Sequence, residues 1–156
     1  MTRINRKIII LIVVVILATA FIFSNSLKNS QESHKDSGII VGLVESIVDA
    51  IFLNNDLDLN YIVRKGAHLF EFFVLGVVVM LLLLQSKNEK INKVILACIY
   101  VIAIALIDEF IQSFNDRTSS FIDVLIDTTG GLIGIGLILL FYFFKKSKMN
   151  IRQLDK

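Results

Sequence analysis

A histidine and a glutamate lie in the opening turns of a long apolar run, where ionisable side chains are uncommon. His68 and Glu71 stand near the start of residues 67–84, which are otherwise apolar. A charge at the centre of a membrane helix costs roughly 2.5 to 3.5 kcal/mol, so such groups usually face a bundle interior and mark a functional site. We therefore expect His68 and Glu71 to belong to a polar site whose other members come from elsewhere in the chain.

Two further segments place acidic side chains where an apolar run ends or begins. These polar residues are, in chain order, Asp108, Glu109, Gln112, Asp123 and Asp127. Helical residues three or four positions apart share a face, so each segment predicts a polar stripe that can face the others. Carboxylates cannot all ionise close together at low dielectric unless cations offset them. The cations available for this are Arg64, Lys65, His68 and Arg117.

The composition and the apolar runs predict an all-α, polytopic membrane protein that forms one domain over residues 1–156. Apolar residues make up 55% of the chain, which is more than a soluble core of this size needs. A membrane helix needs about 20 predominantly apolar residues. On this basis we expect four transmembrane helices at about residues 8–24, 67–84, 94–112 and 121–144.

Two segments are expected to lie outside the spanning helices. Residues 24–37 are rich in serine, asparagine, glutamine and charge, which favours a solvated loop. Residues 38–53 are apolar, but Glu45 and Asp49 stand four positions apart and give a helix there a polar stripe. Such a segment suits an interfacial or re-entrant amphipathic helix better than a full span.

The distribution of lysine and arginine predicts the orientation of the chain. Placing both termini in the cytoplasm assigns eleven of the sixteen lysine and arginine residues to the two tails and residues 85–93. Cytoplasmic segments of membrane proteins carry such an excess. We therefore expect a multi-pass plasma membrane protein with its N-terminus and C-terminus in the cytoplasm. The three polar stripes would then lie near the outer leaflet.

Taken in order, the polar residues resemble the pattern of the VanZ-like membrane protein family. That pattern is an Arg-Lys-x-x-His-x-x-Glu entry to one helix, an Asp-Glu-x-x-Gln exit from another, a nearby arginine, and an aspartate-rich start to a glycine-bearing last helix. The matching elements are Arg64-Lys65 with His68 and Glu71, Asp108-Glu109 with Gln112, and then Arg117, Asp123, Asp127, Gly130 and Gly134. One departure is the loop before the arginine, which reads Phe114-Asn115-Asp116 where an aromatic or proline-containing loop is often expected.

The resemblance implies a polytopic protein of the bacterial cell envelope. The family's namesake lowers susceptibility to the glycopeptide antibiotic teicoplanin without rebuilding the cell-wall precursor. The first functional hypothesis is therefore binding without a reaction, in which cations hold an anionic group of an envelope lipid, a wall precursor or the antibiotic. The residues expected to line such a binding site are Arg64, Lys65, Glu109, Gln112, Arg117, Asp123 and Asp127. Membrane lipid is the expected partner, and no nucleic acid is expected.

A second hypothesis is a membrane-embedded hydrolase or transferase that acts on a lipid-linked phosphate or ester. Its catalytic residues would be His68 as general base, with Glu71 or Asp108 orienting the imidazole. A variant adds a divalent cation such as Mg²⁺ or Mn²⁺, held by a mainly oxygen donor set. That set would be His68, Glu71, Asp123 and Asp127. No other cofactor is expected.

Two further alternatives remain open. A proton path through the acids is disfavoured by their shallow, one-sided placement. A structural role, in which the charges only join three helix ends, stays in competition with every binding or catalytic role. The small-xxx-small spacing of Gly130 and Gly134, with Gly131 beside them, favours close helix packing over ligand contact.

Overall fold

The computed structural model describes residues 6–27, 59–86, 90–114 and 120–154, and these residues form helices without any strand. The helices are α1 (Arg6–Ser26), α3 (Leu59–Leu83), α4 (Lys90–Gln112) and α5 (Phe121–Leu154). Each is long and apolar enough to cross a membrane. The predicted all-α fold with four spanning helices is confirmed. The helix expected at residues 38–53 lies outside the described residues.

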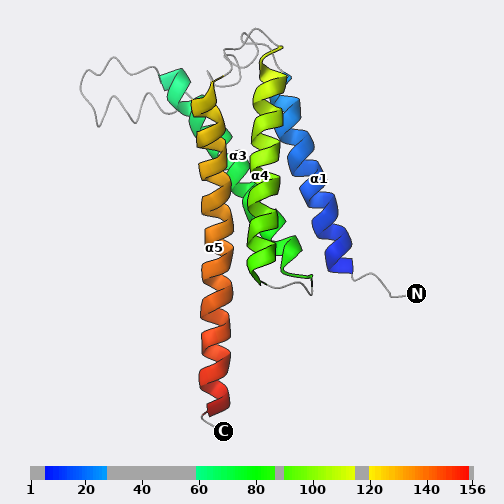
Figure 1. The fold of residues 1–156 in the computed structure, drawn as a ribbon, viewed down its shortest axis with the longest axis vertical. Helices are drawn as coiled ribbons and strands as arrows, with labels where there is room; N and C mark the ends of the chain where they lie inside the picture. Colours follow the sequence, from blue (N-terminus) through cyan, green and yellow to red (C-terminus); the bar gives the residue numbers. More distant parts are fainter. Residues whose placement is uncertain (1–5, 28–58, 87–89, 115–119, 155–156) are drawn as a thin grey trace, which may run out of the picture.

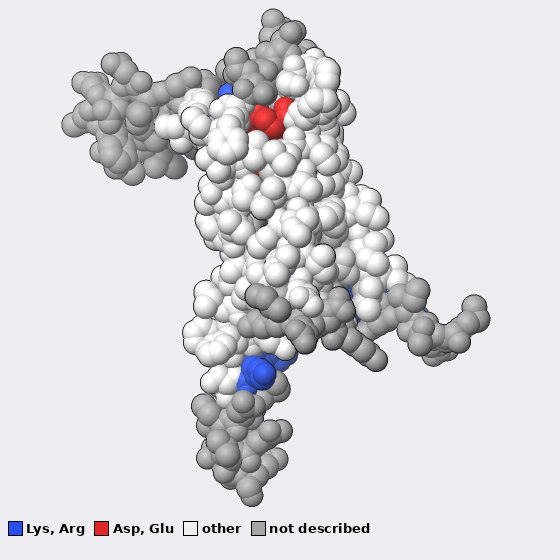
Figure 2. All heavy atoms as spheres, in the orientation of Figure 1, with Lys and Arg blue, Asp and Glu red and all other residues white. Residues whose placement is uncertain are grey.

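Successive helices run in opposite directions through the bundle (Figure 1). The N-terminal ends of α1 and α4 and the C-terminal ends of α3 and α5 lie at one end. The opposite end gathers the C-terminal ends of α1 and α4 with the N-terminal ends of α3 and α5, and we call it the polar end. Figure 2 shows acidic side chains on the surface near the polar end and a basic patch toward the other.

The helices are longer than the apolar runs that predict them. α3 begins at Leu59, so the basic pair Arg64 and Lys65 lies within the helix instead of before it. α5 continues to Leu154, well past residue 144, because the residues after the apolar run include good helix formers such as lysine, arginine and leucine. α1 extends to Ser26, so the loop expected from residue 24 is wrong for its first three positions.

The buried core lies on the faces that α3 and α4 turn toward their neighbours. Phe72, Leu75 and Met80 of α3 and Val101 and Ala105 of α4 are fully buried. Many apolar side chains on the outer faces of the bundle are exposed, as a lipid environment permits. Because lipid tails are as apolar as leucine, membrane helices associate through close packing and interhelical hydrogen bonds instead of hydrophobic burial.

Glycines bring α3 and α5 into backbone contact. A Cβ atom on Gly130 would overlap the carbonyl oxygen of Leu69, and one on Gly134 would overlap that of Phe73. Gly76 of α3 meets the backbone of Gly131 in the same way. The helix-packing role predicted from the glycine spacing is confirmed, and the packing fixes how the polar residues at the start of α5 face those of α3.

Candidate functional site

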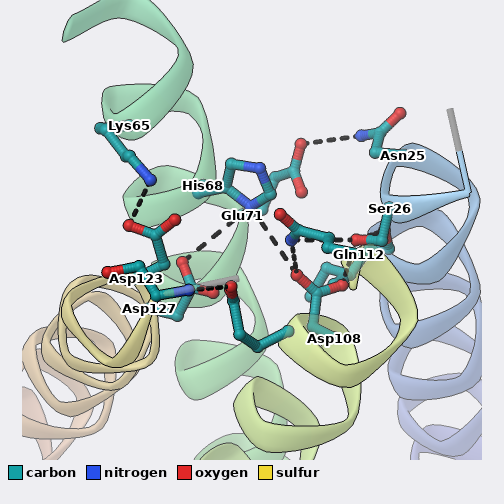
Figure 3. Close-up of polar contacts among 12 residues, drawn as sticks. Asn25, Ser26, Lys65, His68, Glu71, Asp108, Gln112, Asp123 and Asp127 are labelled. Carbon is teal, nitrogen blue, oxygen red and sulfur yellow. Dashed lines mark hydrogen bonds and ion pairs between the residues drawn. The ribbon is translucent and has the colours of Figure 1, made fainter. Parts of the chain in front are cut away.

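Polar side chains from all four helices meet at the polar end of the bundle (Figure 3). The last turn of α1 contributes Asn25 and Ser26. The other members are Lys65, His68 and Glu71 of α3, Asp108, Glu109 and Gln112 of α4, and Asp123 and Asp127 of α5. The structure therefore brings together the three stripes found in the sequence and adds a fourth helix to them. We call this set the polar cluster.

Asp108 is fully buried and connects three helices. Its carboxylate accepts a hydrogen bond from the hydroxyl of Ser26 in α1 and another, of 2.6 Å, from Nε2 of Gln112 one turn later in α4. Its Oδ2 atom lies 3.9 Å from Nδ1 of His68 in α3. Buried carboxylates need such donors because an unsatisfied charged group in low dielectric is costly. Asp108 is thus held in a fixed position by its neighbours.

His68 lies between two carboxylates. Its Nδ1 atom is 3.9 Å from Oδ2 of Asp108 and 4.0 Å from Oδ1 of Asp127, which is also buried. Figure 3 shows the imidazole between these two aspartates, one from α4 and one from α5. One donor atom from each of the three residues lies within 4.8 Å of the other two. An imidazole in such surroundings can transfer a proton or help hold a cation.

The first turn of α5 is fixed to α4. The backbone N–H of Ser120 donates a 2.5 Å hydrogen bond to Oε1 of Glu109, and the Ser120 hydroxyl accepts one of 3.2 Å from the N–H of Ile122. The second bond is an N-terminal cap, which satisfies one of the free N–H groups at a helix start. Because α5 is anchored there, Asp123 and Asp127 are positioned toward α3.

Two further contacts tie α3 to its neighbours. Nδ2 of Asn25 donates a 2.8 Å hydrogen bond to Oε1 of Glu71 and so joins α1 to α3. Lys65 forms an ion pair with Asp123, with about one seventh of each side chain exposed (14%), and so joins α3 to α5. These contacts occupy Glu71 and Asp123 with partners of their own.

The residues predicted for catalysis and those predicted for metal binding can each be compared with the residues that lie close to His68 in the structure. His68 and Asp108, predicted to act together, are adjacent. Of the residues that the structure describes, the three that offer donor atoms within reach of one ion are His68, Asp108 and Asp127. The predicted metal set instead had Glu71 and Asp123 beside His68 and Asp127.

Part of the polar cluster lines a small depression. Its walls come from α3, α4 and α5, and its lining residues are Lys65, His68, Gln112, Asp123, Ile126 and Asp127. Asp108 is held by Ser26 and Gln112. His68 and the buried Asp127 therefore line the depression, and Asp108 lies beside them without lining it.

Of the three basic residues predicted to bind anions, the structure describes Arg64 and Lys65. Arg64 is half-buried, and its Nε atom has no hydrogen-bond partner among the described residues. Arg117 lies outside the described residues. Lys65 points to the depression but is paired with Asp123.

Sequence reasoning missed the contribution of α1. Asn25 and Ser26 follow an apolar run and resemble the start of a polar loop, yet both hydrogen-bond to acids of other helices. The face that includes Ser26 is defined by the structure, in which the buried positions of α1 are Val15, Ile22 and Ser26, spaced seven and four residues apart. That spacing continues one helix face into the polar residues.

The fold and the polar cluster define the class of protein: an integral membrane protein whose described residues form four spanning helices, with a group of ionisable residues buried at one end of the bundle. The family follows from a comparison with known families. The VanZ/LLP1 family model matches residues 9–142, and the chain belongs to that family. No curated protein and no solved structure shows a significant match to the chain.

Proposed function

We propose that this protein is a bacterial envelope protein whose polar cluster binds the anionic head group of an envelope lipid or lipid-linked wall precursor. The observation that carries the proposal is the convergence of His68, Asp108 and Asp127, from three helices, beneath a depression at the end of a membrane bundle. Ionisable groups in such a position are costly to maintain and usually mark a site.

The polar cluster is placed at the outer leaflet in this proposal. The N-terminal ends of α1 and α4 and the C-terminal ends of α3 and α5 lie at the end of the bundle opposite the polar end, so the two tails and residues 85–93 are assigned to that side in this proposal. They carry most of the lysine and arginine residues, which favours the cytoplasmic side for them. The polar end then faces the wall, where precursors and glycopeptide antibiotics such as teicoplanin meet the membrane. Lower susceptibility to teicoplanin is the cellular effect that we propose.

A second candidate function is hydrolysis or transfer at a lipid-linked phosphate or ester. The observation in its favour is His68, whose Nδ1 atom lies close to Asp108 and Asp127. Carboxylates beside an imidazole fix its orientation and stabilise the imidazolium that forms when it accepts a proton. In this function His68 would take a proton from an attacking water or hydroxyl group. Binding of the same head group precedes the reaction, so both candidates use the same depression.

The competing role is purely structural, in which the polar cluster only joins helix ends. The contacts of Asn25 with Glu71 and of Ser26 with Asp108 serve that role directly. His68 and Asp127 differ from them because they also line the depression. The two groups of residues therefore allow the structural role and the binding role to be separated by experiment.

The test compares His68→Gln and Asp127→Asn with the tether variant Asn25→Ala in cells that depend on this protein for reduced teicoplanin susceptibility. Membrane abundance and antibiotic susceptibility are measured together. The proposal expects His68→Gln and Asp127→Asn to restore susceptibility at normal abundance, while Asn25→Ala acts, if at all, through lower abundance. If susceptibility changes only when abundance falls, the polar cluster is structural and the proposed function is wrong.

A further inference from the structure

We propose that the polar cluster holds a hard divalent cation between Nδ1 of His68, Oδ2 of Asp108 and Oδ1 of Asp127. The distances from Nδ1 to the two oxygens are 3.9 and 4.0 Å, and the three residues offer donor atoms within 4.8 Å of one another. A cation in the middle of such a triangle lies roughly 2.5 Å from each donor, which is within the range of oxygen ligands to divalent cations. Small side-chain rotations would shorten these distances for a smaller ion.

The donor set indicates the class of ion. Two carboxylate oxygens and one imidazole nitrogen suit Mg²⁺, Mn²⁺ or Ca²⁺ better than a thiol-seeking metal. The ligands come from α3, α4 and α5, so an ion there would also join three helices. Asp108 receives hydrogen bonds from Ser26 and Gln112, which is the kind of outer support that orients a metal-binding carboxylate.

A second observation, outside the three ligands, is a buried carboxylate oxygen of the polar cluster that has no hydrogen-bond donor among the described residues. Glu109 is only 6% exposed, and its Oε2 atom has no hydrogen-bond partner among the described residues. Its charge interacts unfavourably with those of Asp123 and Asp108 and favourably with that of Lys65. A buried carboxylate oxygen without a donor, next to other carboxylates, is costly. A divalent cation offsets several of these charges together, and its bound water can donate to such an oxygen.

The lysine of the polar cluster supplies only one positive charge to these carboxylates. Lys65 forms its ion pair with Asp123, on the side of the depression formed by α3 and α5. Asp108 and Asp127 are almost completely buried and both lie near His68. A cation between them offsets the charge of both at once.

The cation would also explain how an acid-rich cluster receives an anion, an extension that rests on the function proposed above. Three protein ligands leave coordination positions free, and His68 and Asp127 line the depression. A phosphate oxygen of a lipid head group can fill one of those positions, as substrate phosphates do at Mg²⁺ sites. Lys65, also in the lining, lies where it can face the same phosphate.

Mn²⁺ is the probe for this inference, because electron paramagnetic resonance counts bound ions and pulsed measurements detect a coordinated imidazole nitrogen. The full chain, purified in a non-ionic detergent and stripped with chelator, is titrated with Mn²⁺. We expect one tightly bound ion per chain with a nitrogen signal. Asp108→Asn and Asp127→Asn should each weaken binding by at least about tenfold. His68→Gln should remove the nitrogen signal.

The matched control is Asp123→Asn, which removes an equally charged side chain of the same helix that is paired with Lys65. It should weaken Mn²⁺ binding much less than Asp127→Asn does, and it should retain the nitrogen signal. Asp127→Asn relieves repulsion between carboxylates, so it should stay folded without Mn²⁺ and lose only the rise in melting temperature that Mn²⁺ gives the unaltered chain. Absence of tight binding, or equal loss of binding in Asp123→Asn and Asp127→Asn, would overturn the inference.

A lipid arm separates this inference from the proposed function. The purified chain is mixed with vesicles of phosphatidylglycerol or of phosphatidylcholine, with Mn²⁺ or with chelator, and bound lipid is measured. Retention of phosphatidylglycerol that requires Mn²⁺ supports both proposals. Tight Mn²⁺ binding without any preference for phosphatidylglycerol supports the cation and counts against head-group binding. Equal phosphatidylglycerol retention with chelator overturns the bridging role of the cation and leaves the proposed function standing.

Discussion

The hydroxyl of Ser26 at the end of α1 donates a hydrogen bond to Asp108 near the end of α4, within the polar cluster. Both residues are fully buried. The contact links a residue that looks like the start of a loop to the acid that lies next to His68. The geometry of the polar cluster therefore depends on a helix that contributes no ionisable group to it among the described residues.

Ser26→Ala removes this donor and leaves one oxygen of Asp108 poorly satisfied. Interhelical hydrogen bonds in membrane proteins average about 0.6 kcal/mol, but bonds to charged groups are stronger, so we expect a loss of about 1 to 2 kcal/mol. The measurement is thermal unfolding of the purified protein in one detergent. Ser24→Ala, at an exposed position two residues earlier, is the control and should be nearly neutral. Equal effects of the two changes would contradict the assigned role of Ser26.

Gly134→Ala tests the packing that aligns α5 with α3. The added methyl group would overlap the backbone at Phe73, and overpacking of this kind costs about 1 to 3 kcal/mol. Gly136→Ala, two residues further along α5, meets nothing within 4 Å and should be neutral or slightly stabilising because alanine favours helices. The measurement is the melting temperature of each variant, which should fall for Gly134→Ala and not for Gly136→Ala. A stable Gly134→Ala variant would mean that the two backbones are not in contact there.

Lys65 and Asp123 should be energetically coupled, because their ion pair is mostly shielded from solvent. Lys65→Met leaves Asp123 without its cation among other carboxylates, whereas the double change with Asp123→Asn removes both charges. We expect the double variant to recover about 1 kcal/mol relative to the sum of the two single changes. The measurement is a double-mutant cycle on unfolding free energies. Strict additivity would contradict the ion pair.

The orientation can be tested by labelling single cysteines in intact cells. In a Cys98→Ala background, cysteine is placed at Phe114, exposed near the polar end, or at Lys146, exposed beyond the apolar part of α5. A membrane-impermeant maleimide should label position 114 in intact cells, and position 146 only after permeabilisation. The reverse pattern would place the polar cluster at the cytoplasmic face and would exclude direct action on the outer surface.

The number and type of the helices were predictable because apolar runs of sufficient length have few alternatives in a membrane. Helix ends were less predictable. Arg64 and Lys65 lie inside α3, where Lys65 finds a carboxylate partner in Asp123 of α5. Composition cannot show that Asn25 and Ser26 remain helical, because their polarity is balanced by partners on other helices.

The gathering of polar residues at one end of the bundle followed from their positions near helix ends and from the alternating direction of the helices. The individual pairings did not follow. Whether Lys65 or Arg64 meets Asp123 depends on how α3 and α5 are rotated about their axes, which the glycine contacts determine. The same packing brings Asp127 to His68 and pairs Asp123 with Lys65.

Native mass spectrometry of the purified full chain with phosphatidylglycerol or phosphatidylcholine, in the presence of Mn²⁺, tests head-group binding most directly. The account predicts that the unaltered protein and Ser24→Ala retain phosphatidylglycerol preferentially. It also predicts that His68→Gln and Asp127→Asn lose this preference while remaining folded. If none of the four proteins retains more phosphatidylglycerol than phosphatidylcholine, or if all four show the same preference, the depression lined by His68 and Asp127 does not bind an anionic head group.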